Sequence, residues 1–263
     1  MKIFVINLHS AIERLQFQKK QLSKLGLDYE ILEATSIHDI NSEIYAKHRH
    51  DWQRPLRNTE VACYFSHRSA WKKIIDNNMP ALILEDDALL SKHTPELLNA
   101  IDKYPHTDLI QLEARGRKKI INKQGLEVTP VYTLYRLYQD RTGAAGYILW
   151  PSGAKKLLAH EILHGIGLAD AHISSCYNMK SYQAVPAAII QLDQCHSYCV
   201  KNTSKEYLSK STVSVPRNTK GSLYFLIKRI LAQLKIGLHV VKILSTTSSS
   251  RRLVGVNSDD FLL

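Results

Sequence analysis

The chain has 263 residues, of which 44% are hydrophobic and 22% are charged, and its net charge is +11. This length and composition allow a full buried core and exclude an intrinsically disordered protein. No run reaches the ~18 apolar residues that a membrane span needs.

Residues 2–8 are apolar, but the stretch is too short for a signal peptide. The four cysteines show no paired metal spacing, and their scatter suits a reducing compartment better than a disulfide framework. We therefore expect a cytoplasmic protein that neither crosses a membrane nor is secreted by a signal peptide.

The beginning of the chain alternates between strand and helix patterns. Residues 2–8 predict a buried strand, and residues 29–32 predict a second one. Between them, Ser10 with Glu13 three positions later is typical of a helix start, and Gly26 is typical of a helix end. A strand, a helix and a second strand in this order favour a parallel α/β sheet.

An acidic run follows the next predicted helix, which covers residues 59–78. Residues 81–84 are aliphatic and lead directly into three carboxylates, those of Glu85, Asp86 and Asp87. This pattern predicts an interior strand that ends at a sheet edge, where open α/β sheets bind their ligands. Adjacent like charges repel, so their simplest use is to hold a divalent cation such as Mg²⁺ or Mn²⁺; a solvated acidic turn is the alternative.

The elements predicted after the acidic run continue the same alternation. Thr59 and Thr94 are candidate helix N-caps, the second with a proline directly after it, and another helix begins at Ser152. Short apolar runs predict further strands at residues 108–112, 131–138, 145–150 and 184–192.

The composition changes near residue 200, which divides the chain into a domain of residues 1–200 and a basic tail of residues 201–263. The tail holds eleven Lys and Arg against three acidic side chains. A helix predicted over residues 221–244 is amphipathic, with basic side chains opposite an aliphatic stripe and within roughly 60° of one another. These basic residues are Lys228, Lys235, His239 and Lys242. Such a helix suits an anionic membrane interface, and packing on its own domain is the alternative.

Several separated segments match one family in their order and spacing. They are residues 5–8 with Arg14, residues 59–67, residues 82–87, residues 143–147 with Gly153 and Ala154, and more loosely Ala169 and Asp170. Through these segments, roughly residues 1–200 resemble the family 25 glycosyltransferases, a family of bacterial lipooligosaccharide galactosyltransferases with relatives among the collagen galactosyltransferases.

The resemblance implies a GT-A-like α/β fold, with a Rossmann-type central sheet and flanking helices. It implies a metal-dependent, inverting transfer of galactose from UDP-galactose to a saccharide acceptor of lipooligosaccharide or lipopolysaccharide, with a β-1,4 linkage. UDP-glucose or another hexose donor is the alternative. The expected partners are the nucleotide-sugar donor, a lipid-linked oligosaccharide acceptor and the inner face of the cytoplasmic membrane, to which the enzyme would bind peripherally.

Within the implied fold, Asp87 is expected to bind Mn²⁺ or Mg²⁺, and the two-residue period of a strand puts Glu85 on the same face. A bound cation would stabilise the charge that grows on the diphosphate leaving group. Asp86 points to the other face and is expected to contact the donor sugar or ribose, with a turn contact as the alternative.

The nucleotide is expected to lie beside Asn7, Leu8 and Arg14, at the end of the first strand and the start of its helix. Arg14 is suited to bidentate contact with a phosphate, and a surface salt bridge is its alternative role. Glu60 and His67 are interpreted as groups in or behind the donor pocket.

An inverting transfer needs one carboxylate that removes the proton of the acceptor hydroxyl. Asp170 is the candidate, because desolvation in its apolar, small-residue surroundings would raise its pKa. A helix N-cap is the rival role for Asp170, and His172 and His196 are weaker candidates for completing the metal site.

Two other classes of function compete with a hexosyltransferase. A nucleic-acid-binding protein would explain the basic tail, but it leaves the acidic run unexplained and lacks interleaved aromatic residues. A metal-dependent phosphohydrolase would use the same carboxylates, but it needs additional Asp and His clusters.

Overall fold

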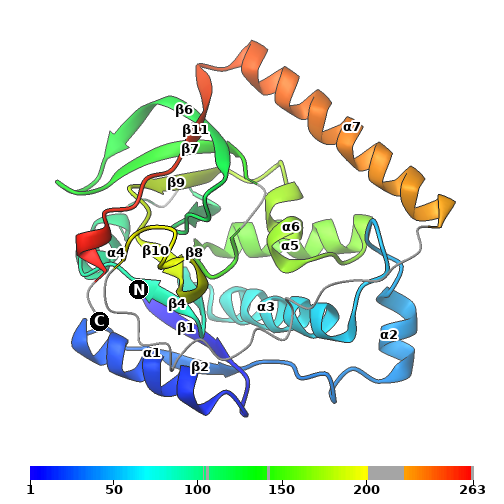
Figure 1. The fold of residues 1–263 in the computed structure, drawn as a ribbon, viewed down its shortest axis with the longest axis horizontal. Helices are drawn as coiled ribbons and strands as arrows, with labels where there is room; N and C mark the ends of the chain where they lie inside the picture. The colour runs from blue at the N-terminus through cyan, green and yellow to red at the C-terminus, as the bar shows by residue number, and fades with distance from the viewer. Residues whose placement is uncertain (103, 105–106, 141–142, 201–221, 262–263) are drawn as a thin grey trace.

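The computed structural model describes residues 1–102, 104, 107–140, 143–200 and 222–261, and its centre is a mixed sheet of nine strands. The order is β11-β6-β7-β9-β5-β8-β3-β1-β2, with β1 parallel to both β2 and β3 (Figure 1). The strands in that order are β11 (Ser249–Leu253), β6 (Lys118–Glu127), β7 (Thr133–Gln139), β9 (Ser181–Val185), β5 (Leu109–Gln111), β8 (Gly146–Leu149), β3 (Ala81–Glu85), β1 (Lys2–Asn7) and β2 (Glu30–Glu33).

Helices cover both faces of this sheet, because successive side chains of the central strands point to opposite sides. Phe4, Ile6 and Ile83 pack with α3 (Asn58–Asn77), α5 (Pro151–His164) and α6 (Ala169–Ser175). Ile3, Val5 and Leu82 pack on the other face with α1 (Ile12–Lys24) and α4 (Thr94–Ile101). The short helix α2 (Ser42–His48) lies beside α3. The α/β, GT-A-like class expected from the sequence is confirmed in this arrangement.

Several predicted helix starts were wrong in detail, although the helices exist. Helix α1 has Ala11 rather than Ser10 at its N-cap, because a turn from the Ala11 amide to the Leu8 carbonyl carries the chain one residue further. Helix α3 begins at Asn58, and the α4 N-cap is His93. In α3 the carboxylate of Glu60 accepts from the Arg57 amide at 3.0 Å and takes the capping role predicted for Thr59.

The strand predicted at residues 184–192 is in fact two strands of different sheets. Strand β9 ends at Val185, and Pro186, which has no amide hydrogen for a ladder, follows it. After the break, β10 (Ile189–Gln191) pairs antiparallel with β4 (Ala88–Leu90) in a separate two-stranded sheet. This small sheet lies directly after the acidic run and holds it in place.

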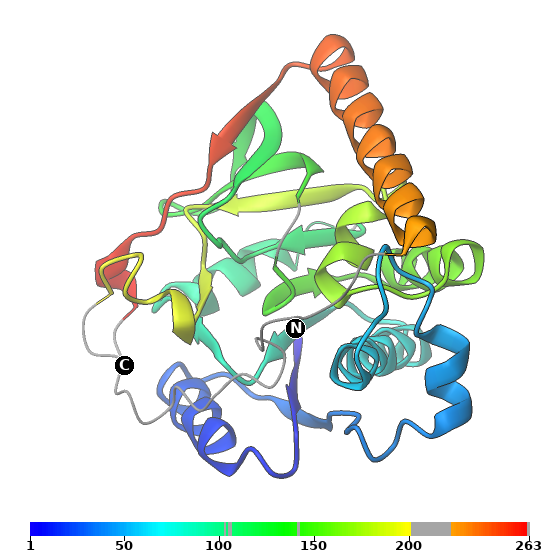
Figure 2. The same cartoon turned by 45° about the vertical axis from the view of Figure 1, so that its right-hand side comes forward.

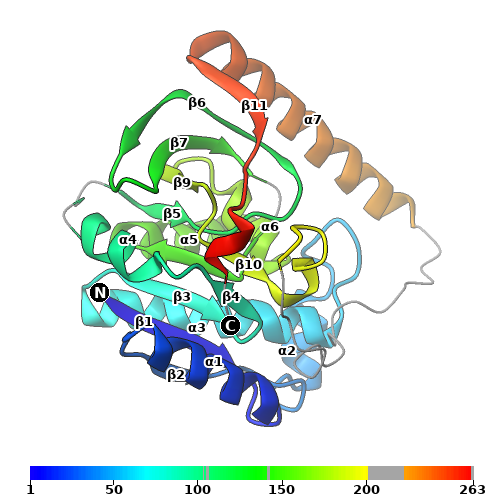
Figure 3. The same ribbon diagram turned by 60° about the vertical axis from the view of Figure 1, so that its left-hand side comes forward.

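The C-terminal part of the chain returns to the body of the protein. After helix α7 (Leu223–Thr246), strand β11 pairs antiparallel with β6, as Figure 3 shows. Phe261 is buried with Phe17 and Leu89. Residues 249–261 are therefore part of the same core as the preceding residues, whereas residues 201–221 of the predicted tail lie outside the described residues.

Helix α7 lies along the outside of the molecule (Figure 2). In the described part of the chain, no helix is both long and apolar enough to cross a membrane. Two residues of the basic arc contact the protein: Lys228 donates to the His50 carbonyl at 2.7 Å, and His239 to the Tyr138 carbonyl at 3.1 Å, whereas Lys235 and Lys242 are exposed. The aliphatic stripe therefore points outward.

Candidate functional site

The three carboxylates lie in the tight turn between β3 and β4, at the carboxyl end of the parallel strands. Two buried glutamines of α1 hold the backbone of this turn. Gln18 Nε2 donates to the carbonyls of Asp86 and Ala88, and Gln21 Nε2 also donates to the Ala88 carbonyl. These bonds from α1 fix the backbone of the turn.

Asp86 points toward α1 and joins residues that the sequence placed at the nucleotide site. Its two carboxylate oxygens accept from Asn7 Nδ2 and from an Arg14 guanidinium nitrogen, each at 2.9 Å. Burial raises the pKa of Asp86, and the charge and hydrogen bond of Arg14 oppose that effect. The expected grouping of Asn7, Arg14 and Asp86 therefore exists, with Asp86 as the residue that orients the other two.

Glu85 points to the α3 side of the sheet and ends a chain of buried hydrogen bonds. The Trp71 indole donates to the Tyr147 hydroxyl at 2.8 Å, that hydroxyl lies 3.0 Å from His67 Nδ1, and His67 Nε2 lies 3.1 Å from Glu85 Oε1. The ionised Glu85 carboxylate can only accept, so His67 Nε2 is the donor in this pair. His67 thereby fixes the orientation of the Glu85 carboxylate.

Asp87 is the carboxylate whose charge is least well balanced. Burial raises its pKa, the charge of Glu85 raises it further, and Arg14, 3.9 Å away, opposes the shift. The amide of Gln191, on β10, donates to Glu85 Oε2 at 3.1 Å and to Asp87 Oδ1 at 3.4 Å. Among the described residues, its own buried Oε1 has no hydrogen-bond partner.

This donor set fits a hard divalent cation. Two desolvated carboxylates that repel each other and a buried amide oxygen without a partner are oxygen ligands of the kind that Mg²⁺ and Mn²⁺ prefer. Glu85 and Asp87 are the residues that would hold it, and Gln191 would add its oxygen by turning its amide, whose NH2 group faces both carboxylates here. Cys63, His67 and Glu85 also offer ligand atoms within 4.8 Å of one another, but burial raises the pKa of the Cys63 thiol well above its usual value. That thiol therefore stays protonated and is a poor ligand.

Two residues of the site were missed by the sequence reading. Gln111 Nε2 donates to the Gly143 carbonyl at 2.7 Å, and Glu113 Oε2 accepts from the Ala145 amide at 2.9 Å. Together they clamp the loop before β8, where Gly143 has φ of +109° and a Cβ would come within 2.8 Å of Glu113 Oε2. Polar residues at every second position of an apolar strand end were the signal that could have indicated them.

Glu113 should make stability depend on pH. Burial and then the charge of Glu85 raise its pKa to about 8, so the folded chain holds this proton more tightly than the unfolded chain does. The unfolding free energy should therefore decrease as pH rises from about 5 to 8, by at most about 1.4 kcal/mol per pH unit from this group. Glu113→Gln keeps the acceptor for Ala145 and removes the titration. Denaturant unfolding across this pH range should show a flatter profile for the variant, and parallel profiles would contradict the assignment.

Asp170 lies in the first turn of α6, and its N-cap is Leu168. Its Oδ1 accepts from the Ala171 amide at 2.7 Å, so Asp170 is not the N-cap residue but satisfies one amide of the first turn. Burial raises its pKa, as predicted from the apolar sequence around it, and the charge of Glu85 contributes to the shift. Asp170 is therefore within electrostatic reach of the acidic turn although it comes from a different element.

Other predicted residues have structural partners. Glu60 forms a bidentate pair with Arg54, at 2.8 and 3.0 Å, and Leu8 packs on the core at the α3 face. His172 is buried, stacks on Trp71 and contacts the Tyr64 hydroxyl, so it is a core histidine rather than a metal ligand. His196 is exposed.

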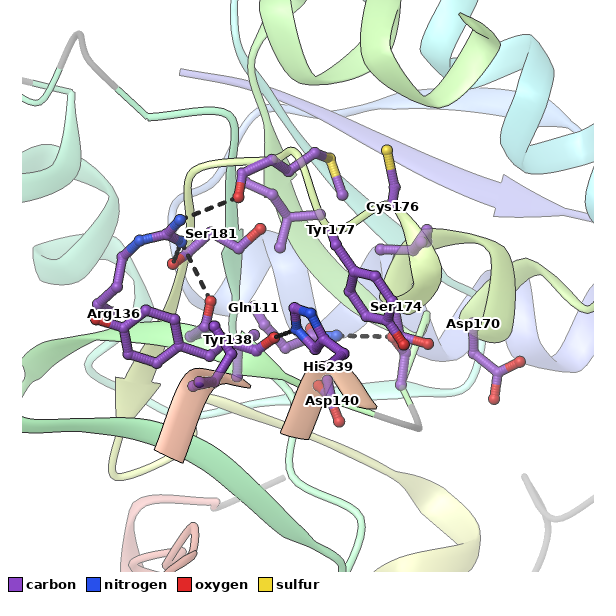
Figure 4. A pocket seen from close by; sticks show the side chains of 16 residues that line it. Gln111, Arg136, Tyr138, Asp140, Asp170, Ser174, Cys176, Tyr177, Ser181 and His239 are labelled. Carbon is purple, nitrogen blue, oxygen red and sulfur yellow. Dashed lines mark hydrogen bonds between the residues drawn. The ribbon is translucent and has the colours of Figure 1, made fainter. Parts of the chain in front are cut away.

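A cavity of about 190 Å³ opens beside Asp170 (Figure 4). Residues of β5, β7, α6 and α7 line it, with the rings of Tyr177 and His239 near its centre. The site therefore has two parts, an acidic turn and a neighbouring cavity, and Asp170 lies at the edge between them.

The sheet and the acidic turn define an α/β protein with a polar turn at the carboxyl ends of parallel strands, the edge at which open α/β sheets bind their ligands. The model of one family, described as glycosyltransferase family 25 (LPS biosynthesis protein), matches residues 1–164. The chain belongs to this family, and it is therefore a glycosyltransferase. The family resemblance expected from the sequence is confirmed.

Curated relatives are distant in sequence. The lipooligosaccharide biosynthesis protein lic2B of Haemophilus influenzae is 25% identical over 90% of this chain and 97% of its own length. Procollagen galactosyltransferase 1-A of Xenopus laevis is 29% identical over 62% of this chain and 28% of its own length. Procollagen galactosyltransferase 2 of Homo sapiens is 26% identical, and this chain spans 30% of it.

Solved structures are related only loosely. The glycosyltransferase involved in the glycosylation of the major capsid of PBCV-1 has a TM-score of 0.33 at 11% identity, over 62% of this chain and 66% of its own. The inositol-1-phosphate CTP transferase from T. maritima has a TM-score of 0.43 at 11% identity, over 78% of this chain and 93% of its own.

Proposed function

We propose that this enzyme transfers galactose from UDP-galactose to a saccharide acceptor of lipooligosaccharide or lipopolysaccharide, with inversion, a β-1,4 linkage and a bound Mn²⁺ or Mg²⁺. The observation that carries the proposal is the acidic turn, in which Glu85 and Asp87 are held ready for a cation while Asp86 orients Asn7 and Arg14. The names of the relatives, a lipooligosaccharide biosynthesis protein and procollagen galactosyltransferases, support the choice of sugar and acceptor.

The residues divide the work between donor and acceptor. Asn7, Leu8 and Arg14 lie where the nucleotide and its diphosphate bind, and Asp86 keeps Arg14 in position; Glu60 supports the start of α3 beside them. A cation bound by Glu85 and Asp87 supplies electrostatic stabilisation of the leaving diphosphate. Asp170 accepts the proton of the acceptor hydroxyl as that oxygen attacks the anomeric carbon from the face opposite the diphosphate.

Release of UDP tests the proposal. Purified enzyme with Mn²⁺ should release UDP from UDP-galactose faster when truncated lipooligosaccharide is added, and the product should carry a new β-linked galactose by NMR. UDP-glucose and other UDP-hexoses in parallel reactions test the donor. Equal rates with and without saccharide, for every donor, would contradict the transferase proposal.

We also propose that the enzyme binds peripherally to the inner face of the cytoplasmic membrane through α7. The outward stripe consists of exposed aliphatic side chains, among them Leu223, Leu226, Ile227, Ile230, Leu231, Leu234, Leu238 and Val241. Lys235 and Lys242 are exposed and border this stripe by helical spacing. An aliphatic face with lysines at its edge suits the boundary between headgroups and acyl chains of an anionic bilayer.

Replacing two outward leucines tests the membrane proposal without disturbing the contacts of α7 with the protein. The double variant Leu231→Ser, Leu238→Ser should bind anionic phospholipid vesicles at least about tenfold more weakly, because burial of one leucine contributes about 1.5–3 kcal/mol. Ile37→Ser, at an exposed aliphatic residue away from α7, is the control. Binding should also weaken with salt. Equal binding of all three proteins in a flotation assay would exclude this surface.

A further inference from the structure

The cavity beside Asp170 has a wall that comes from the far end of the chain. His239 of α7 stacks on Tyr177, with ring centroids 3.7 Å apart and an angle of 10° between the planes. The same histidine bonds to the Tyr138 carbonyl, and Ile243, one helical turn further on, also lines the cavity. Helix α7 is thus attached at this point, and it closes a space that the rest of the protein would leave open.

The other walls combine apolar side chains with polar side chains that have fixed partners. Arg136 donates to the carbonyls of Ser181 and Met179, and this pairing fixes the floor under Tyr138. Asp140 is held from behind by the buried Lys119 at 2.6 Å. The cavity therefore combines aromatic rings with the carboxylates of Asp140 and Asp170.

This combination matches the chemistry of a sugar ring. Sugar hydroxyls donate hydrogen bonds to carboxylates, and the C–H faces of the ring pack on aromatic side chains. A volume of about 190 Å³ has room for a single hexose unit rather than for an extended chain. A phosphate would meet two carboxylates here, and the Arg136 guanidinium that also lines the cavity is already bonded to the carbonyls of Ser181 and Met179.

Asp170 connects the cavity to the acidic turn. It lines the cavity, and the charges of Glu85 and Asp140 both act on it. In Figure 4 the Asp170 carboxylate lies at one end of the cavity, directed away from the ring pair. A hexose bound at that end of the cavity would have a hydroxyl next to Asp170.

We propose that this cavity is the subsite for the terminal hexose of the acceptor, and that α7, through His239 and Ile243, completes it. The proposal rests on the proposed transferase function for its orientation relative to the donor. It assigns α7 a second role: one face of the helix would contact the membrane while the opposite face closes the sugar-binding site. The terminal hexose would then be bound next to the membrane that carries the lipid-linked acceptor.

Two variants and a control test the subsite. His239→Ala removes the wall, and Ser174→Leu fills the cavity from α6 while keeping both residues of the ring pair. Gln233→Ala changes an exposed residue of α7 that does not line the cavity. Methyl β-glucoside, methyl β-galactoside and methyl N-acetyl-β-glucosaminide serve as probes for saturation-transfer NMR with the full chain. At least one should bind the wild type and Gln233→Ala saturably, and bind the other two variants at least about tenfold more weakly.

Kinetics provide a separate reading. With UDP-galactose and truncated lipooligosaccharide, His239→Ala should raise the acceptor KM at least about tenfold and leave the donor KM within twofold. If UDP-galactose is not consumed, the proposed reaction fails, and the NMR result still decides whether the cavity binds sugar. The subsite is wrong if none of the three glycosides binds the wild type, or if all four proteins bind them equally. If the His239→Ala variant does not fold, glycoside binding by the Ser174→Leu variant alone tests the subsite.

Discussion

Replacing Asp87 by asparagine should lower kcat/KM at least about 10²-fold. The change keeps the size of the side chain and removes one charged oxygen, and metal stabilisation of a leaving group contributes several kcal/mol to lowering the barrier. Wild-type activity should also disappear in EDTA and return with Mn²⁺ or Mg²⁺. UDP release measured under both conditions checks the prediction.

The matched control is Asp76→Asn, at an exposed carboxylate of α3 away from the acidic turn. It should retain wild-type kinetics. Full activity of the wild type in chelator would overturn the metal assignment, and a loss of activity in both variants would point to a general effect of charge. Direct titration of Mn²⁺ by calorimetry, which does not depend on turnover, should show weaker binding only for Asp87→Asn.

Replacing Asp170 by asparagine should lower kcat by about 10²–10⁴-fold with little change in donor KM, if Asp170 is the general base. The amide oxygen can still accept from the Ala171 backbone, so the local structure of α6 should persist. A base must be deprotonated to act. Because burial raises the pKa of Asp170, wild-type kcat should fall as the pH decreases through that raised pKa.

The variant should lack this acidic limb of the pH profile. A nearly normal kcat for Asp170→Asn would move the role of base to another carboxylate, of which the buried Glu113 is the first to test by Glu113→Gln. A rise in donor KM with unchanged kcat would instead place Asp170 in the donor pocket.

Local patterns were enough to predict the centre of the site. The run of aliphatic residues before Glu85 is typical of an interior strand, and parallel strands bring their carboxyl ends to one edge of the sheet. The family resemblance placed Asn7 and Arg14 at this edge as well, and the parallel pairing of β1 with β3 brings them to the acidic turn. The raised pKa of Asp170 also followed from its apolar neighbours in sequence.

The remaining parts of the site depend on pairings between distant segments. Gln191 reaches the acidic turn only because β10 pairs with β4, about a hundred positions earlier in the chain. Glu113 gains its raised pKa from burial under the loop at Gly143. Helical periodicity correctly divided α7 into a basic and an aliphatic side. Periodicity alone does not tell which side contacts the protein, and the bonds of Lys228 and His239 show that part of the basic side does.

The pairing of β11 with β6 has a consequence for the solubility of the folded chain. Strand β6 spans Lys118–Glu127, and β11 covers its first half through residues 118–122. Without β11, a ten-residue strand would form the open border of the sheet, and its free N–H and C=O groups would be a template for pairing with other molecules. Strand β11 thus protects β6 from pairing with other molecules, and a protein truncated after α7 would tend to aggregate.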